Sequence, residues 1–105
     1  MTIHTSSVIH PDADLAQGVK VGPFTTIGPN VRIGEGTIIG PNVLIEAGSV
    51  IGKDCEIFHG ASLGGEPQIF NFKNVPATVE IGDGTVIREY VTIHRSGNEN
   101  GVTRV

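Results

Sequence analysis

This sequence of 105 residues has no tryptophan, one cysteine, one methionine and only five aromatic residues, four Phe and one Tyr. A single cysteine cannot build a disulfide framework or a four-cysteine zinc site. No apolar run approaches the ~20 residues of a membrane span, and the polar segment Met1–Thr5 does not resemble a signal peptide, so no membrane insertion is expected. The seven Lys and Arg are scattered and outnumbered by eleven Asp and Glu, which argues against nucleic-acid binding. We expect a soluble, cytoplasmic protein with one domain, residues 1–105.

The sequence does contain a strong repeat of six residues. Counting in sixes from Ile3 to Val105, seventeen of eighteen positions are Ile, Leu or Val, and Glu99 is the exception. Chance would place about five there, because 28 of the 105 residues are of these types. A period of six fits neither a helix, whose period is 3.6, nor a hairpin sheet of period two.

The other phases of the repeat describe a coil. Glycine often follows the aliphatic residue, turn formers come next, and small or β-branched residues stand four steps after it. One short strand and one corner per six residues fit this pattern, and three such units close a triangular coil. We therefore predict an all-β fold, a parallel β-helix built from hexapeptide repeats. Resemblance to hexapeptide proteins implies a left-handed coil. In this fold one column of aliphatic side chains is buried, formed by Ile27, Ile33, Ile39, Ile45 and Ile51. Gly28, Gly34 and Gly40 are expected at corners.

Two stretches depart from the pattern. From Gly65 to Ala77 the small-residue phase is lost and Phe70 and Phe72 appear, which we interpret as an extruded loop that partly replaces one coil. The segment 97–101 is rich in Gly and Asn and predicts a corner loop before a strand over 102–105. A decorated coil without a binding role is the alternative interpretation of the first stretch.

Several strings in the chain also occur in one enzyme family. They are His10-Pro11, Ala61-Ser62-Leu63-Gly64-Gly65, Val79-Glu80-Ile81-Gly82-Asp83 and, most specific, Ile87-Arg88-Glu89-Tyr90-Val91-Thr92-Ile93-His94-Arg95. On these strings, the chain resembles the N-terminal part of the UDP-N-acetylglucosamine acyltransferases that begin lipid A biosynthesis. The resemblance extends along essentially the whole chain.

The resemblance implies a cofactor-free O-acyltransferase. It would move a 3-hydroxyacyl group from acyl carrier protein to the 3-hydroxyl of UDP-N-acetylglucosamine, in a homotrimer whose active sites lie between subunits. In the family, a general-base histidine lies in the coils that follow the strand ending in Thr103-Arg104-Val105. The expectation is therefore an N-terminal fragment that lacks the general base, has no catalytic residue of its own and shows no turnover.

Three residues are predicted to bind substrate. His94 occupies a phase that elsewhere holds glycine, so we expect an exposed corner imidazole that donates to a sugar or phosphate oxygen. Arg95 carries a planar guanidinium that suits a diphosphate or carboxylate. Gln68 is retained from the family's loop motif. Ile69 and Asn71 replace the acidic and basic residues usual there, which predicts weak binding of UDP-N-acetylglucosamine and leaves another sugar nucleotide open. A surface histidine and a solvated arginine are the simpler interpretations.

The remaining polar candidates have structural interpretations. Arg88 and Glu89 form a charged pair, at the surface or between subunits. His59 is expected to pack or cap at its corner. His4 and His10 lie in the first coil, where they are expected to cap the end of the β-helix. Cys55 stands in the small inward phase, which predicts a buried filler and not a nucleophile.

Three other functions stay open at this point. The chain could be an inactive structural β-helix fragment, or belong to a divergent hexapeptide sugar-nucleotide acyltransferase. Some trimeric hexapeptide β-helices are zinc-dependent carbonic anhydrases with three histidine ligands. His59 and His94 are 35 residues apart, one short of two coils, and could approach the same edge. The third histidine of that family is missing, so no metal site is expected.

Overall fold

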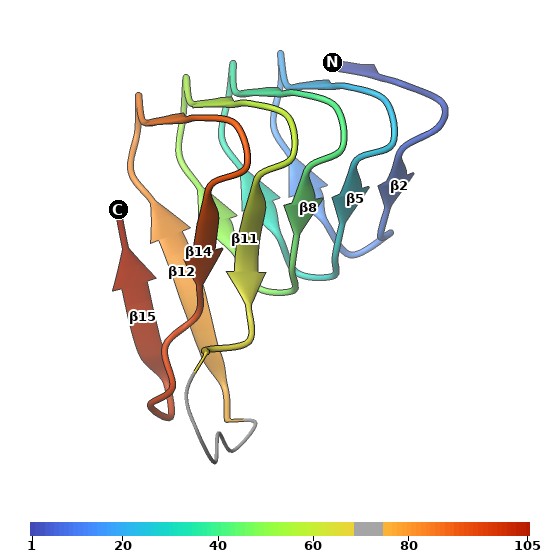
Figure 1. Ribbon diagram of the computed structural model, residues 1–105. Coiled ribbons are helices and arrows are strands. Elements are labelled where there is room, and N and C mark those ends of the chain that lie inside the picture. Colours follow the sequence, from blue (N-terminus) through green and yellow to red (C-terminus); the bar gives the residue numbers. More distant parts are fainter. Residues whose placement is uncertain (69–74) are drawn as a thin grey trace.

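The strands of this chain form three parallel sheets that enclose a triangular prism. The computed structural model describes residues 1–68 and 75–105, and its fifteen strands are arranged in three five-stranded sheets (Figure 1). Sheet A contains β1 (Thr2–Ile3), β4 (Lys20–Val21), β7 (Ile38–Ile39), β10 (Glu56–Ile57) and β13 (Val86–Ile87). Sheet B contains β2 (Val8–Ile9), β5 (Thr26–Ile27), β8 (Leu44–Ile45), β11 (Ser62–Gly65) and β14 (Thr92–His94). Sheet C contains β3 (Asp14–Leu15), β6 (Arg32–Ile33), β9 (Val50–Ile51), β12 (Ala77–Ile81) and β15 (Gly101–Arg104). Residues 1–68 and 75–105 include no helix of the length and apolar character needed to span a membrane.

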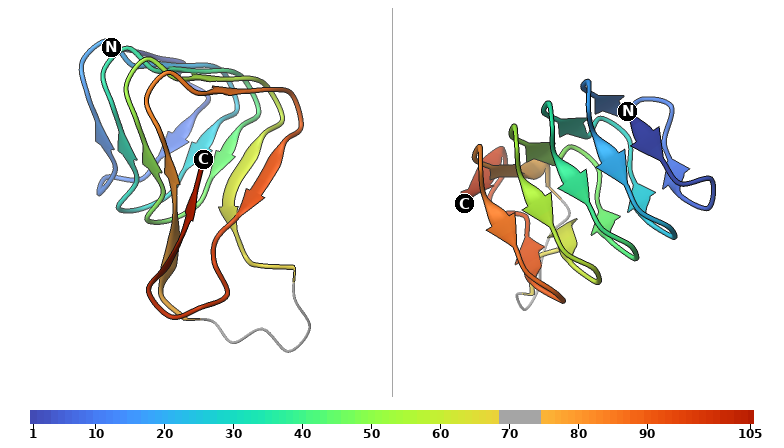
Figure 2. Two further views of the ribbon diagram at one scale, coloured as in Figure 1. Left: turned by 90° about the vertical axis from the view of Figure 1, so that its left-hand side faces the viewer. Right: turned by 90° about the horizontal axis from the view of Figure 1, so that it is seen from above.

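Consecutive strands lie on consecutive sides of the prism, so the chain winds as a coil. Each strand pairs in parallel with the strand one coil later; Val21 pairs with Ile39, 18 residues on. In the end-on view of Figure 2, which has the C-terminal end in front, the chain runs clockwise as it approaches the viewer. That sense of winding is left-handed. The predicted left-handed parallel β-helix is confirmed.

The interior is a column of aliphatic side chains. The five isoleucines predicted to line it, from Ile27 to Ile51, are each no more than 2% exposed. The small residues that stand four steps after each inward aliphatic residue also point inward, beside this column. Some of them form hydrogen bonds between coils. The Thr37 hydroxyl donates to the Gly52 carbonyl at 2.8 Å, and the Cys55 thiol donates to the Gly82 carbonyl at 3.1 Å. Cys55 is buried as predicted, but this phase carries a polar ladder as well as filling space.

The corners require two different backbone properties. Left-handed backbone occurs at the third residue after the inward aliphatic, for example at Asn42 with φ 55° and Gly36 with φ 73°. The glycine directly after the aliphatic has another role, because a Cβ on Gly34 would lie 2.7 Å from the Gly52 carbonyl carbon. Gly28, Gly34 and Gly40 therefore precede the turns and allow close stacking. The prediction that they form the corners themselves was wrong in this respect.

The irregular stretches are insertions between sheet B and sheet C. Ile51 pairs with Ile81, 30 residues on instead of 18, so twelve extra residues lie between β11 and β12. In the next coil Val105 lies beside Ile81, because its N–H donates to the Glu80 carbonyl and its carbonyl accepts from the Gly82 N–H. That spacing of 24 residues means six extra residues between β14 and β15, and these include Glu99. The loop near 65–77 is thus confirmed as an extrusion, but it is added at a corner and does not replace a coil. The strand predicted over 102–105 is β15, which begins at Gly101, one residue earlier than predicted.

Candidate functional site

Both insertions leave the prism at the same corner, in adjacent coils. Beyond this corner β12 and β15 continue their pairing from Ala77–Gly101 to Glu80–Arg104, where an ordinary coil pairs only two residues (Figure 1). The end of β11 and the end of β14 run beside each other on the other side of the corner. Residues from four strands therefore meet around one extended edge, which we call the insertion corner. The predicted site residues His94 and Arg95 both lie here.

A β-bulge in β11 sets the position of His94. Leu63 pairs with Ile93, but the next pair joins Gly65 to His94, so Gly64 is an extra residue in the ladder. Gly64 has φ 83°, and a Cβ there would lie 2.4 Å from the Ser49 hydroxyl oxygen. Only glycine meets both conditions without strain. The bulge brings the Glu66 carbonyl within reach of the His94 ring.

The His94 imidazole is half-buried and hydrogen-bonded at one nitrogen. Its Nδ1 lies 2.7 Å from the Glu66 carbonyl oxygen. Its Nε2 is buried, and within the described part of the chain it has no hydrogen-bond partner. The prediction of an exposed corner side chain was wrong, because His94 ends a paired strand and is not in a turn. The prediction that it binds substrate is not tested by this geometry.

Arg95 continues along the same edge. Its backbone N–H donates to the Gly65 carbonyl at 2.9 Å, and its Nη1 donates to the Gly64 carbonyl at 3.3 Å. Its side chain also lines a groove on the insertion corner, together with Ala47, Val75, Pro76 and Ala77. Arg95 thus contributes a charged group to a groove whose other lining residues are Ala, Val and Pro.

The other residues of the predicted site are less defined. Gln68 is exposed and lies two residues after Glu66. Ile69 and Asn71, whose identities weaken the match to the family, lie outside the described residues, as do Phe70 and Phe72. The roles assigned to these positions remain predictions.

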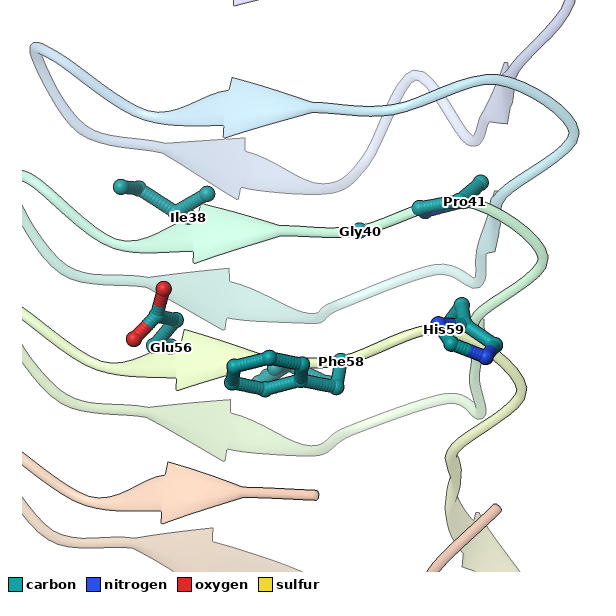
Figure 3. Close-up of a pocket in the computed structure, with 7 residues that line it drawn as sticks. Ile38, Gly40, Pro41, Glu56, Phe58 and His59 are labelled. Atoms are coloured by element: carbon teal, nitrogen blue, oxygen red, sulfur yellow. The ribbon is translucent and has the colours of Figure 1, made fainter. Parts of the chain in front are cut away.

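A second groove lies on sheet A and its corner with sheet B (Figure 3). Strands β7 and β10 line it through Ile38 and Glu56, and Phe58 and His59 follow at its end. The guanidinium of Arg88 lies 4.3 Å above the centre of the Phe58 ring, a cation–π arrangement. His59 makes an edge contact with Tyr90, with ring centres 5.4 Å apart. The predicted packing role of His59 is confirmed.

Arg88 and Glu89 form an ion pair within the chain at the protein surface. The Arg88 Nε donates to Glu89 Oε1 at 2.8 Å. This hydrogen bond is the largest cause that holds the pKa of the Glu89 carboxyl below its ordinary value, and a backbone hydrogen bond at Glu89 is the second. Both side chains are solvated, so the pair stabilises the fold only weakly.

The histidines proposed for a zinc site lie apart. His59 follows β10 at the corner between sheets A and B, whereas His94 ends β14 at the corner between sheets B and C. The premise that both approach one edge was wrong. Twelve of the residues between them belong to the insertion and not to the coils, so His94 lies at the corner after that of His59. Residues 1–68 and 75–105 contain no group of three His, Cys, Asp or Glu side chains placed to hold a metal ion. His4 and His10 accept from the backbone N–H of Ser6 and Asp12 through Nδ1, so each caps a turn of the first coil; their predicted role in capping the end of the β-helix stays a prediction.

Sequence reasoning missed two contributors to the insertion corner. Gly64 was grouped with the other glycines that follow an aliphatic residue, although it alone among them has positive φ. The hydroxyl of Thr103 donates to the His94 carbonyl at 2.9 Å, a contact that closes the six-residue insertion. The departure from the repeat at Glu99 was the available signal that β14 and β15 are separated by an insertion.

Comparison with known proteins agrees with the fold. The family model "Bacterial transferase hexapeptide (six repeats)" matches residues 12–47 and 30–65, which together cover 12–65. The chain is 52% identical over 95 residues, 90% of its length, to a Trichlorobacter lovleyi protein named acyl-[acyl-carrier-protein]–UDP-N-acetylglucosamine O-acyltransferase. It spans 36% of that relative.

Solved structures give the same result. The Francisella novicida UDP-N-acetylglucosamine acyltransferase superposes with a TM-score of 0.94 at 42% identity over 99% of this chain and 38% of its own. The Acinetobacter baumannii LpxA also superposes with a TM-score of 0.94, at 36% identity over 100% of this chain and 41% of its own. The family match covers more than half of the chain and coincides with regular coils of the prism. The chain therefore belongs to the bacterial transferase hexapeptide family.

Proposed function

We propose that this chain is the N-terminal part of an O-acyltransferase of lipid A biosynthesis. The reaction moves a 3-hydroxyacyl group from the thioester of acyl carrier protein to the 3-hydroxyl of UDP-N-acetylglucosamine. Residues 1–105 serve in it as a single β-helix domain, and the proposed location is the cytoplasm. The observation that carries this proposal is the similarity to the Trichlorobacter lovleyi enzyme, which extends over 90% of the chain.

The proposed contribution of this chain is binding and not proton transfer. His94 and Arg95 are neighbours at the insertion corner, where the Arg95 side chain lines a groove with Ala47, Val75, Pro76 and Ala77 and the half-buried His94 imidazole lies one residue before it. Pockets for small ligands are typically apolar with a few placed polar groups. Arg95 suits the diphosphate, because a guanidinium offers several donors in one plane. Gln68 contributes from the segment directly after Glu66.

The proposal includes a homotrimer, and the outer faces of the prism support it. The outward side chains of sheet B carry no charge: Val8, Thr26, Leu44, Ser62 and Thr92. Those of sheet C are mostly charged: Asp14, Arg32, Val50, Glu80 and Arg104. An uncharged face is cheaper to cover with protein than a charged one. We place the segment 88–95, which joins sheet A to sheet B, near the subunit seam.

The test is a chimera, because the chain spans 36% of the Trichlorobacter lovleyi enzyme. Residues 1–105 replace the matching N-terminal segment of that enzyme, and acyl transfer to UDP-N-acetylglucosamine is measured. We expect activity, and we expect His94→Ala to lower it by about tenfold or more, as for the loss of one hydrogen bond to a substrate. His10→Ala is the matched control, since His10 lies in the first coil, away from the insertion corner.

A folded, trimeric chimera without activity would contradict the proposal. Equal loss in His94→Ala and His10→Ala would contradict the location of the binding site. Binding of UDP-N-acetylglucosamine to the chimera, measured by calorimetry, separates a binding defect from a slow chemical step. Retained activity in His94→Ala would remove His94 from the proposed site.

A further inference from the structure

The hydrogen bond of His94 determines which ring nitrogen carries the proton. A backbone carbonyl oxygen can only accept a hydrogen bond. Because the His94 Nδ1 lies 2.7 Å from the Glu66 carbonyl, Nδ1 must be the donor. In a neutral imidazole the other nitrogen is then an acceptor. His94 Nε2, which is buried, therefore presents a lone pair and no proton.

Thr103 fixes the backbone that carries this ring. Its hydroxyl donates to the His94 carbonyl at 2.9 Å across the six-residue insertion. Thr103 itself lies in β15 and pairs with the buried Val79 of β12. On the opposite side the ladder from β11 holds His94 opposite Gly65. The end of β14 is thus held from both sides of the insertion corner.

We infer that His94 is held as the Nδ1–H tautomer, with its ring oriented by the Glu66 carbonyl and its backbone by Thr103, so that Nε2 accepts a hydrogen bond from a ligand hydroxyl or amide N–H. Thr103 acts here as a positioning residue. The acceptor role reverses the expectation that His94 donates to a sugar or phosphate oxygen. A phosphate oxygen carries no proton to give when ionised, so the matching ligand group is a sugar hydroxyl or an acetamido N–H.

The chemical consequence is selectivity for a donor. A ligand hydroxyl or N–H at this point would give the buried, unpartnered Nε2 its hydrogen bond, whereas a ligand without a donor would leave it unsatisfied, so a ligand with a donor binds more tightly. The identity of the ligand as a hexosamine nucleotide rests on the proposed function. The tautomer does not rest on it, because it follows from the chain's own contacts.

The first experiment needs no ligand. Nitrogen-15 NMR of the imidazole groups at about pH 8.5, where an ordinary imidazole is neutral, distinguishes a protonated ring nitrogen from a bare one. We expect the Nδ1–H form of His94 to exceed the Nε2–H form by about tenfold, as for one net hydrogen bond. A dominant Nε2–H form would overturn the inference.

Variants of Thr103 test the positioning role. Thr103→Val removes the hydroxyl and should reduce the tautomer preference of His94 severalfold, whereas Thr103→Ser should keep it. Thr85→Val is the matched control, because Thr85 also donates to a corner carbonyl, that of Gly82 at 2.8 Å, but at another corner. A Thr103→Val spectrum identical to the wild type would overturn the role of Thr103. If that variant does not fold, the wild-type spectrum still decides the tautomer.

The ligand arm uses UDP-N-acetylglucosamine itself as the probe. A hydrogen bond accepted by Nε2 should move the Nε2 resonance of His94 at saturation and leave that of His59 unchanged. Binding without this shift would overturn the acceptor role. Absence of any binding by the chimera would count against the proposed function, while the tautomer result without ligand would stand.

Discussion

Individual hydroxyl side chains connect the coils of this protein from the inside. The Thr37 hydroxyl donates to the Gly52 carbonyl at 2.8 Å and accepts from the Cys55 N–H at 3.1 Å. Thr25, twelve residues earlier and at another corner, makes the same two contacts with the Gly40 carbonyl and the Val43 N–H. Backbone groups at the corners cannot all bond to each other, because strands of two residues leave many unpaired. These threonines supply the partners.

Thr37→Val, which replaces one hydroxyl by a methyl group, should lower the free energy of unfolding clearly. The substitution keeps the shape but leaves two backbone groups without their partner, which costs about 1–3 kcal/mol. The control is Thr26→Val, since Thr26 is exposed on sheet B and should change stability by less than about 0.5 kcal/mol. Urea unfolding followed by circular dichroism measures both. Equal stabilities for the two variants would exclude the ladder as a source of stability.

The Arg88–Glu89 pair predicts a pH effect of known sign. The pKa of the Glu89 carboxyl is lowered mainly by the hydrogen bond from Arg88. A folded-state pKa below the unfolded one adds stability above the unfolded value, and this stability is lost as pH falls through the folded pKa. Arg88→Met should therefore raise the pKa of the Glu89 carboxyl toward its ordinary value. Carbon-13 NMR titration of the carboxyl measures it, and Lys20→Met, on a distant coil, should leave it unchanged.

Each element of this fold, a two-residue strand with its corner, depends on glycine for space in one position and for backbone conformation in another. Gly34 has ordinary φ, but its Cβ would collide with the backbone of Gly52 and Lys53 at 2.7–2.8 Å. Gly84 has φ 68° and nothing within 4 Å of its Cβ position. The two glycines therefore separate the steric requirement from the conformational one.

For these elements, Gly34→Ala should cost more than Gly84→Ala. In the first case two coils of backbone must separate, and overpacking of this kind costs about 3 kcal/mol. In the second only the left-handed conformation is penalised, by about 1–2 kcal/mol. Thermal and urea unfolding of both variants give the comparison. A larger loss in Gly84→Ala would mean that corner conformation, and not coil spacing, limits stability.

Over the described residues, the faces of the prism differ in charge, and exposed aromatic side chains lie along the edge between sheets A and B. Phe24 and Tyr90 lie at the third residue of corners between sheets A and B and are 67% and 73% exposed. Large exposed aromatic side chains near uncharged surface are typical of protein interfaces. The charged face of sheet C has the opposite character. The proposed trimer would cover the first region and leave the second in water.

For the assembly, Tyr90→Asp should weaken the trimer and Arg32→Glu should not. The first substitution places a charge at the proposed seam, and the second changes a charge on the sheet C face, where water still solvates it. Sedimentation velocity at tens of micromolar measures the oligomer. A wild-type monomer would contradict the trimer, and dissociation by Arg32→Glu would assign the seam to the wrong face.

The repeat in the sequence determined the coil, its column of isoleucines and the six-residue spacing of its corners. These follow from local chemistry, because one aliphatic residue per side must point inward and one flexible residue per corner must turn the chain. The strand around Ile93 could likewise be placed on a side of the prism, with Ile93 pointing inward, from the period alone.

Only the tertiary structure decided how the two irregular stretches fit into the coil. The two insertions contain twelve and six residues, which are multiples of the repeat, so the aliphatic phase resumes after them and the sequence does not show whether each stretch replaces part of a coil or is added to one. Pairing of Ile51 with Ile81 resolves this, because hydrogen bonds between coils depend on stacking and not on distance along the chain. The same stacking separates His59 from His94 and brings Thr103 and the Glu66 carbonyl to the His94 residue. Its tautomer is set by contacts between residues 28 positions apart, which no local pattern encodes.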